Sequence, residues 1–234
     1  MPMRRHIKCV LIGDGGVGKT CLATKFAKGV FPSGYVPTTF DAHTVACTLP
    51  GGRVVELHVW DCAGQHEFDQ VRHYAYFPTL DVFVLCFSLV SRVSLVHCER
   101  RWMREARGFD ERIPVILVGT QLDARDNMMV KEGGGQLKRV ISRREGQEVA
   151  ARIGAVHYFE VSALQGKNVR KVFEAAARLG AEERLEEEGE EGEEQDKGGM
   201  RRVGNGEQVF MRGGERMIEP DTRPGRETGC CTVQ

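Results

Sequence analysis

Apolar runs of strand length alternate with longer segments of helical character along roughly the first 180 residues. We expect strands at residues 7–13, 44–49, 54–61, 82–89, 114–120 and 158–163. The turn signal Pro-Gly-Gly at residues 50–52 joins the second and third of these runs into a hairpin. The runs at 82–89 and 114–120 are apolar throughout, which is typical of strands covered on both faces.

Helical patterns fill the intervals between these runs. The segments 18–28 and 91–108 have helical composition. In the segment 168–181 the apolar residues recur at the spacing of one helix face: Val169, Val172, Phe173 and Ala176. Because strands that alternate with helices favour a sheet flanked by helices, the pattern predicts an α/β fold with a six-stranded, mostly parallel sheet.

Two stretches depart from this alternation. Residues 126–141 contain Glu-Gly-Gly-Gly-Gln and are expected to form a partly helical insertion. Residues 181–197 hold ten acidic residues against one Arg and one Lys, and such a block repels itself and buries little. We therefore expect a domain over residues 1–180, a disordered acidic and Gly-rich tail over 181–229, and a short terminal motif over 230–234.

Composition and charge narrow the classes of function. The formal net charge is zero, so charge does not indicate a nucleic-acid partner. The eight cysteines show no metal-ligand spacing, which favours a reduced, cytosolic compartment. The apolar run at 82–90 is far shorter than the roughly 20 residues that a membrane-spanning helix needs.

The octapeptide GDGGVGKT at residues 13–20 follows the first expected strand and opens the first expected helix, which is the context of a phosphate-binding loop. Its glycines let backbone N–H groups turn toward phosphates, and the helix N-terminus adds positive potential. Lys19 would reach the β- and γ-phosphates, and the Thr20 hydroxyl would ligate Mg²⁺.

The segment VWDCAGQ at residues 59–65 supplies a second part of such a site. Asp61 closes an apolar strand, where its carboxylate can hold Mg²⁺ through water. Gly64 can offer its backbone N–H to a γ-phosphate, and Gln65 can orient an attacking water. Thr38, in the polar stretch 31–41, is a candidate second Mg²⁺ ligand, although composition alone indicates an ordinary connecting loop there.

Six segments, which include those just described, together resemble the Ras superfamily of small GTPases and, within it, the Rho family near Rac. They occur in the order and spacing of that family: GDGGVGKTCL, FPSGYVPTTFD, WDCAGQ, DVFVLCFSLVS, ILVGTQLDARD and YFEVSAL. The resemblance covers about residues 6–180 and the last four residues. It implies a P-loop NTPase G domain, in which the insertion at 126–141 is the extra helix of Rho members.

The resemblance also implies the roles of single residues. The phosphate-binding set would be Gly15, Gly16, Val17, Gly18, Lys19, Thr20 and Cys21. Further contacts to the nucleotide and its Mg²⁺ would come from Phe31, Tyr35, Thr38, Asp61 and Gly64. The catalytic residues would be Gln65 and Lys19. The base would be read by Thr120, Gln121 and Asp123, with support from Ser162, Ala163 and Leu164. The effector region would be Tyr35, Val36, Pro37, Thr38, Thr39, Phe40 and Asp41, and residues 31–41 and 62–77 would be the two switch regions.

Asp123 has a chemical reason to select guanine. Its carboxylate can accept hydrogen bonds from guanine N1–H and the 2-amino group, a donor pair that adenine lacks. Gln121 stands where small GTPases commonly carry Lys, so it keeps a shorter apolar stem and loses the charge. We expect Asp123 to set guanine specificity and Gln121 to tune affinity only.

A few residues depart from the family pattern, namely Cys62 for Thr, His66 for Glu and Phe68 for Tyr. The family Glu at the position of His66 helps to stabilise the nucleotide-free state during exchange. None of the three changes removes an expected phosphate or Mg²⁺ ligand. Trp60 is similar to the Trp with which Rac-like members select exchange factors, although a core role is equally compatible with a Trp at a strand end.

The last four residues, Cys231-Thr-Val-Gln, fit a prenylation motif, and the terminal Gln favours a farnesyl group. One lipid anchors a protein only weakly, so a second signal is expected. Residues 200–229 carry six Arg against five acids, which is no polybasic run, and Cys230 is the candidate for palmitoylation. We expect the cytoplasmic side of the plasma membrane or endomembranes, with a cytosolic pool.

The function implied by the resemblance is a switch that binds GTP with Mg²⁺ and hydrolyses it to GDP and phosphate, in actin organisation, polarity or membrane traffic. Implied partners are exchange factors, GTPase-activating proteins, a dissociation inhibitor, effectors such as kinases, and a membrane, with no nucleic acid. Two alternatives stay open. One is the same fold holding GTP with little hydrolysis; the other is a P-loop kinase or ATPase, against which TQLD and VSAL argue.

Overall fold

The computed structural model of the protein describes residues 5–34, 40–65, 72, 75–76, 79–131, 140–196, 201–202, 208–212 and 215–217. In chain order its elements are β1 (Arg5–Ile12), α1 (Lys19–Lys28), β2 (Phe40–Thr48), η1 (Pro50–Gly52), β3 (Val54–Cys62), β4 (Val82–Ser88), α3 (Arg92–His97), η3 (Cys98–Trp102), α4 (Met103–Phe109), β5 (Val115–Thr120), α5 (Leu122–Lys131), α6 (Arg143–Ile153), β6 (His157–Glu160), α7 (Val169–Asp196), β7 (Arg201–Arg202), β8 (Gln208–Arg212) and β9 (Glu215–Met217).

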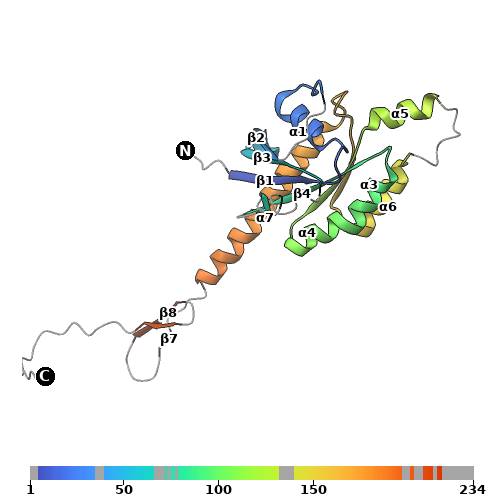
Figure 1. Ribbon diagram of the computed structural model, residues 1–234. Coiled ribbons are helices and arrows are strands. Elements are labelled where there is room, and N and C mark those ends of the chain that lie inside the picture. The colour runs from blue at the N-terminus through green and yellow to red at the C-terminus, as the bar shows by residue number, and fades with distance from the viewer. Residues whose placement is uncertain are drawn as a thin grey trace, which may run out of the picture. The chain divides into compact units, whose positions relative to one another are not determined.

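Six strands form one sheet in the order β2-β3-β1-β4-β5-β6 (Figure 1). β2 runs antiparallel to β3, and all other neighbours in this sheet are parallel. The predicted α/β fold with a six-stranded, mostly parallel sheet is therefore confirmed. Because parallel strands end at one edge of a sheet, the loops that follow β1, β3, β4, β5 and β6 gather at that edge, where α/β proteins bind ligands.

Two apolar cores lie on opposite faces of the sheet. On one face, Leu22 of α1 and Phe173 of α7 pack with Leu11 and Val84 of the strands. On the other face, Trp102 and the buried side of α6 pack with the alternate residues of β4 and β5. Every residue of β4 and β5 is buried, which confirms the prediction drawn from their continuous apolar runs.

The structure moves several element boundaries. β2 begins at Phe40, four residues before the expected strand. The sequence did not reveal this start because Phe40, Asp41 and Ala42 are all exposed and show no hydrophobic alternation. The expected helix at 91–108 is divided into α3, one π-helical turn (η3) and α4. β6 ends at Glu160; of the expected strand residues 161–163, Ser162 forms only an isolated β-bridge with Lys167, and Ala163 begins a turn.

The chain divides into two compact units, residues 1–184 and 185–234. α7 continues past the expected end at residue 181 to Asp196, as the high helix propensity of Glu favours. In the second unit β8 pairs antiparallel with both β7 and β9. The rest of the expected tail, beyond α7 and these three strands, lies outside the described residues. No described helix combines the length and apolar character needed to cross a membrane.

Candidate functional site

The loop between β1 and α1 crosses the edge of the sheet where the parallel strands end. Gly13 has a φ of +144°, and a Cβ at this position would lie 2.1 Å from the carbonyl oxygen of Cys86 on β4. Gly18 caps α1 with a φ of +99°. Two of the glycines in the GDGGVGKT motif are thus required by close packing and by left-handed backbone.

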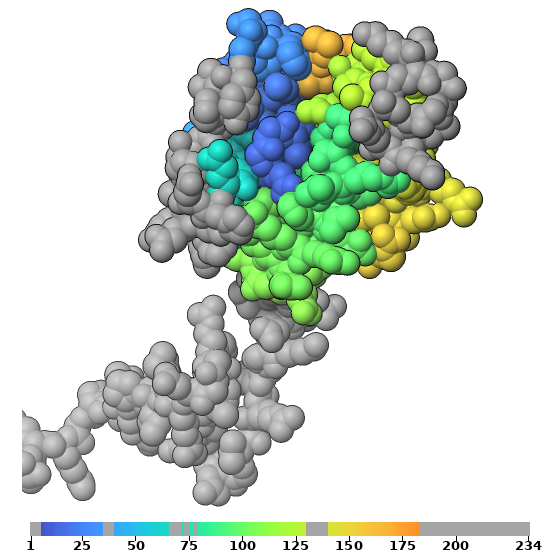
Figure 2. Space-filling view, turned by 45° about the vertical axis from the view of Figure 1, so that its right-hand side comes forward, coloured from blue at the N-terminus to red at the C-terminus, as the bar shows by residue number. Residues whose placement is uncertain are grey.

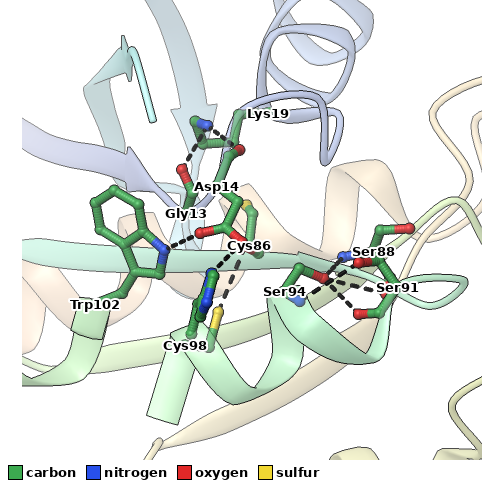
Figure 3. Close-up of polar contacts among 10 residues, drawn as sticks. Gly13, Asp14, Lys19, Cys86, Ser88, Ser91, Ser94, Cys98 and Trp102 are labelled. Atoms are coloured by element: carbon green, nitrogen blue, oxygen red, sulfur yellow. Dashed lines mark hydrogen bonds and ion pairs between the residues drawn. The ribbon is translucent and has the colours of Figure 1, made fainter. Parts of the chain in front are cut away.

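The Lys19 side chain folds back over this loop. Its Nζ donates hydrogen bonds to the carbonyl oxygens of Gly13 and Asp14, both at 2.8 Å (Figure 3). Burial lowers the pKa of the Lys19 ammonium, and the negative charge of Asp61 opposes that shift. The ammonium group is therefore held inside the loop rather than in solvent, next to a carboxylate from β3.

The Asp14 side chain is held from the opposite side by the α3–η3–α4 segment. Trp102 Nε1 donates to Asp14 Oδ1 at 2.8 Å (Figure 3), and His97 Nδ1 lies 2.7 Å from Asp14 Oδ2. Trp102 is fully buried. Our reading of the sequence missed both residues. The sequence did contain one sign of Trp102: it is a single Trp in an otherwise charged helical segment, which indicates a buried contact.

Asp61 reaches the same place from the end of β3. Its side chain is 1% exposed, and among the described residues neither carboxylate oxygen has a hydrogen-bond partner. Burial raises the pKa of Asp61; the nearby Thr20 hydroxyl and the Lys19 charge oppose this shift without closing a well-formed hydrogen bond on either oxygen. A buried carboxylate in this condition is costly, unless a cation or its water shell occupies the neighbouring space.

The turn after β3 packs directly on the phosphate-loop candidate. A Cβ on Gly64 would lie 2.2 Å from the carbonyl oxygen of Gly13 and 2.6 Å from the backbone nitrogen of Gly15. The exposed Gln65 follows, with its Cγ 3.8 Å from where a Cβ of Gly15 would stand. Only glycine fits at position 64, because a side chain there would meet the backbone of the loop after β1.

These segments surround a cavity of about 250 Å³, lined among others by Gly15, Lys19, Thr20, Pro32, Gly64 and Gln121. Figure 2 shows segments that are far apart in the sequence, drawn in blue, green and orange, meeting on this face of the molecule. Cys21 also lines the cavity. Phe31 precedes the lining residue Pro32 in the sequence, is not itself among the lining residues, and is 42% exposed.

The stretch after β5 joins the cavity from another side. Gln121 has a φ of +58°; its Nε2 donates to the carbonyl of Gly16 at 3.2 Å, and Ser88 Oγ donates to its Oε1 at 2.6 Å. The Thr120 hydroxyl lies within hydrogen-bonding distance of the carbonyls of Val17 and Phe87. Gln121 therefore ties the phosphate loop to β4, a role that its sequence position did not reveal.

Asp123 lies in the first turn of α5 and is oriented by the turn after β6. Ser162 Oγ donates to Asp123 Oδ1 at 2.6 Å, and backbone hydrogen bonds between Ser162 and Lys167 hold that turn in place. Ala163 belongs to the same turn, and Leu164 is 54% exposed. The structure thus brings Ser162 to the Thr120–Asp123 stretch; these are residues that the family resemblance assigns to the base.

Other expected site residues lie outside the described residues: Tyr35, Val36, Pro37, Thr38, Thr39, Cys230 and Cys231. Of the two segments expected to be switches, the structure describes residues 31–34, 40–41 and 62–65 together with 72 and 75–76. Trp60 is only partly buried: Lys8 Nζ lies 3.9 Å from its ring centroid, and Phe40 meets it edge-on at 4.9 Å. Trp60 also packs against the core on the Trp102 face of the sheet, at the border of that core.

Comparison with known proteins agrees with this geometry. Residues 8–181 match the model of the Ras family. The chain is 45% identical over 178 residues to GTP-binding protein RHO1 of Candida albicans, covering 76% of this chain and 89% of that protein. It is 43% identical over 172 residues to GTP-binding protein RHO1 of Saccharomyces cerevisiae, covering 73% and 81%. It is 42% identical over 173 residues to the Rho-related protein racC of Entamoeba histolytica, covering 74% and 88%.

Proposed function

The chain belongs to the Rho family of small GTPases, molecular switches that bind guanine nucleotide and hydrolyse GTP, and from that premise we propose which of its residues do so. Residues Gly15, Gly16, Val17, Gly18, Lys19, Thr20 and Cys21 bind the phosphates. The position of Lys19 inside the loop, with its ammonium held by two carbonyls, supports this assignment. The backbone N–H groups of such a loop and the start of α1 provide a fixed positive potential.

Mg²⁺ is held by the hydroxyls of Thr20 and Thr38, with Asp61 acting through water. The observation that carries this assignment is the buried Asp61 carboxylate, which has no hydrogen-bond partner among the described residues and stands beside Thr20 and Lys19. Oxygen ligands of this kind suit Mg²⁺. When bound, the ion would neutralise charge that develops on the phosphate oxygens.

Gln65 orients the attacking water, and Lys19 stabilises negative charge on the transferred phosphoryl group. Gly64 approaches the phosphate loop so closely that its N–H can serve a γ-phosphate without interference from a side chain. Hydrolysis in this class depends on positioning and on charge stabilisation more than on covalent chemistry. We therefore expect slow intrinsic turnover that a GTPase-activating protein accelerates.

Asp123 reads guanine, supported by Thr120, Gln121, Ser162, Ala163 and Leu164, while Phe31 packs against the base. The hydrogen bond from Ser162 to Asp123 supports this assignment, because it fixes one carboxylate oxygen before any base arrives. Gln121 tunes affinity only. Asp123→Asn would then shift preference toward xanthine nucleotides, and Gln121→Lys would leave the guanine preference unchanged.

One experiment tests these assignments together. The nucleotide that copurifies with the chain is identified by chromatography, and single-turnover GTP hydrolysis is followed for the parent and for Gln65→Leu. We expect bound GDP or GTP, measurable hydrolysis by the parent, and tight GTP binding with strongly reduced hydrolysis by the variant. Bound ATP would contradict the assignment of the base site, and GTP held without hydrolysis by the parent would favour a binding module.

The partners and membrane site follow from the same premise. Exchange factors, GTPase-activating proteins, a dissociation inhibitor and effectors such as kinases would act on residues 31–41 and 62–77, with Tyr35 to Asp41 as the effector region. Residues 1–180 would form the switch domain and 181–229 a hypervariable tail. Cys231 would carry a prenyl group and Cys230 a palmitoyl group, anchoring the protein on the cytoplasmic side of the plasma membrane or endomembranes. Membrane partitioning of Cys231→Ser, compared with Cys230→Ser, separates the two signals.

A further inference from the structure

The side of β1 and β3 that carries Trp60 also presents three potential metal ligands that the nucleotide site does not use, beyond the border of the core on that side. His6 on β1 stands directly opposite Glu56 on β3, and Lys8 stands opposite His58 in the same parallel register. Residues two apart on a strand share one face, so His6, Glu56 and His58 point to the same side. The intervening Ile7 and Leu57 point to the opposite side, into the core.

The side chains of these three residues converge. His6 Nδ1 lies 3.1 Å from His58 Nε2 and 3.2 Å from Glu56 Oε2. All three ligand atoms lie within 4.8 Å of one another. Within the described part of the chain this is the one group of three or more His, Cys, Asp or Glu side chains that converges in this way.

These distances can be compared with the geometry of a bound ion. With ligand bonds of about 2.0–2.1 Å, a tetrahedral Zn²⁺ ion separates its ligand atoms by about 3.3 Å. The two distances from His6 Nδ1 are already close to that value. An ion could therefore enter with small side-chain rotations and without a shift of either strand.

The donor set also indicates the class of ion. Two imidazoles and one carboxylate suit Zn²⁺ and neighbouring transition metals, whereas Mg²⁺ prefers oxygen ligands. Three protein ligands leave a fourth position for water. The site is accessible, because the His6 side chain is 62% exposed and that of Glu56 is 22% exposed.

The cluster is separate from the nucleotide site. His6 stands at the start of β1, six residues before Ile12 at its end, a separation of about 20 Å along an extended strand. Lys8, the cation next along this face, stacks on the Trp60 ring at 3.9 Å. An ion bound by the three residues would lie on the face that also carries Trp60, on the same two strands.

We propose that His6, Glu56 and His58 bind a divalent transition-metal ion of the Zn²⁺ class, with water as the fourth ligand. The ion links β1 to β3, because His6 lies on β1 and Glu56 and His58 lie on the neighbouring strand β3. The ion binds only the folded state of the chain, because its ligands lie on strands about 50 residues apart in the sequence and meet only when the sheet has formed.

The test uses the full chain loaded with GDP in excess Mg²⁺, which keeps the nucleotide site occupied. Zn²⁺ is titrated by calorimetry, and Co²⁺ serves as a spectroscopic substitute. We expect one equivalent to bind, with visible bands typical of tetrahedral Co²⁺. A strong ultraviolet thiolate-to-metal band should be absent from this equivalent, since its ligands are nitrogen and oxygen rather than any of the eight cysteines.

His6→Ala and His58→Ala should each weaken this binding by more than about tenfold, which is the loss that removal of even a supporting residue around a metal causes. His43→Ala is the matched control: this strand histidine has one carboxylate neighbour, with its Nε2 3.4 Å from Asp41 Oδ2, and belongs to no group of three. GDP affinity and the unfolding temperature without Zn²⁺ should be unchanged in all three variants, which shows that the fold is intact.

Absence of Zn²⁺ binding by the parent chain would overturn the proposal and leave a hydrogen-bonded cluster. A Co²⁺ spectrum dominated by thiolate bands would also overturn it. So would equal Zn²⁺ affinities for His58→Ala and the parent.

Discussion

Two carboxylates are buried at the same edge of the sheet, and their surroundings differ. The carboxylate of Glu160, at the end of β6, accepts hydrogen bonds from both terminal nitrogens of Arg125, at 2.7 and 2.8 Å, and from the hydroxyl of Tyr158, at 3.0 Å. Asp61, near the end of β3, has no hydrogen-bond partner among the described residues. At Asp61 burial is the dominant influence, and the pKa is raised. At Glu160 burial acts in the same direction, but the hydrogen bonds and charge of Arg125 outweigh it, so the pKa is lowered.

The charge of Glu160 is satisfied by a pair that joins β6 to α5. Asp61 lies beside Lys19 but has no hydrogen-bond partner among the described residues, which supports the proposal that it serves a bound ion. Substitutions at each of the two carboxylates or at their neighbours test this difference.

The largest effect is expected from Arg125→Met, which leaves Glu160 buried without its cation. We expect the free energy of unfolding to fall by about 3–5 kcal/mol, the usual result of breaking a buried ion pair from one side. Chemical denaturation of the GDP-loaded chain measures it. The control is Arg144→Met, which breaks an exposed pair with Glu148 and should cost about 0.5 kcal/mol or less. Equal losses in both variants would contradict the structural role of Arg125.

Asp61→Asn should act in the opposite direction. Without Mg²⁺ the variant should be at least as stable as the parent, by a gain of order 1 kcal/mol, because a buried carboxylate with no hydrogen-bond partner among the described residues is removed. The stabilisation that Mg²⁺ gives the GDP-loaded parent should disappear in the variant. Thermal unfolding in Mg²⁺ and in chelator measures both effects. A variant that Mg²⁺ still stabilises as strongly as the parent would exclude Asp61 from the ion site.

The two carboxylates should also give stability opposite dependences on pH. Asp61 has a pKa above its ordinary 3.8 in the folded state, so its destabilising contribution is present at neutral pH and vanishes as the pH falls through that raised pKa. Glu160 has a pKa below its ordinary 4.5, so its stabilising contribution is present above 4.5 and is lost as the pH falls toward the lowered pKa.

In chelator, the parent should therefore gain stability relative to Asp61→Asn as the pH falls from 7 to 4, and it should lose stability relative to Glu160→Gln as the pH falls below 4.5. Each difference should change by about 1.4 kcal/mol per unit of pKa shift. Denaturation curves at several pH values measure the slopes. Slopes of the same sign would contradict the comparison.

Asp14 lies between these two cases: its carboxylate has two partners, Trp102 and His97, but the His97 side chain is partly exposed. The His97 side chain is 44% exposed, so His97→Ala should cost about 0.5 kcal/mol in stability. Trp102 would still hold the other oxygen of Asp14. Denaturation and the rate of GDP release measure the effect. A loss comparable to that of Arg125→Met would show that His97, rather than Trp102, is the main support of Asp14.

Much of the candidate site could be predicted from short segments. The residues proposed to bind phosphate, Mg²⁺ and base lie largely in short motifs, such as GDGGVGKT and GTQLD, that can be recognised in the sequence. The close packing of Gly64 on the backbone of Gly13 and Gly15 was not predicted, because it depends on how the turn after β3 meets the loop after β1. Gln121 was only partly understood, because its link from Gly16 to Ser88 depends on where the ends of β4 and β5 lie relative to the loop after β1.

The sequence by itself determined the fold class, the phosphate loop and the order of the motifs, because these depend on local periodicity and local spacing. Only the tertiary structure decided which distant side chains meet. The contacts of Asp14 with Trp102, of Arg125 with Glu160, and of His6 with Glu56 and His58 depend on strand register and helix packing. A period of two tells which face a strand residue occupies; the neighbouring strand and its register are set by the assembled sheet.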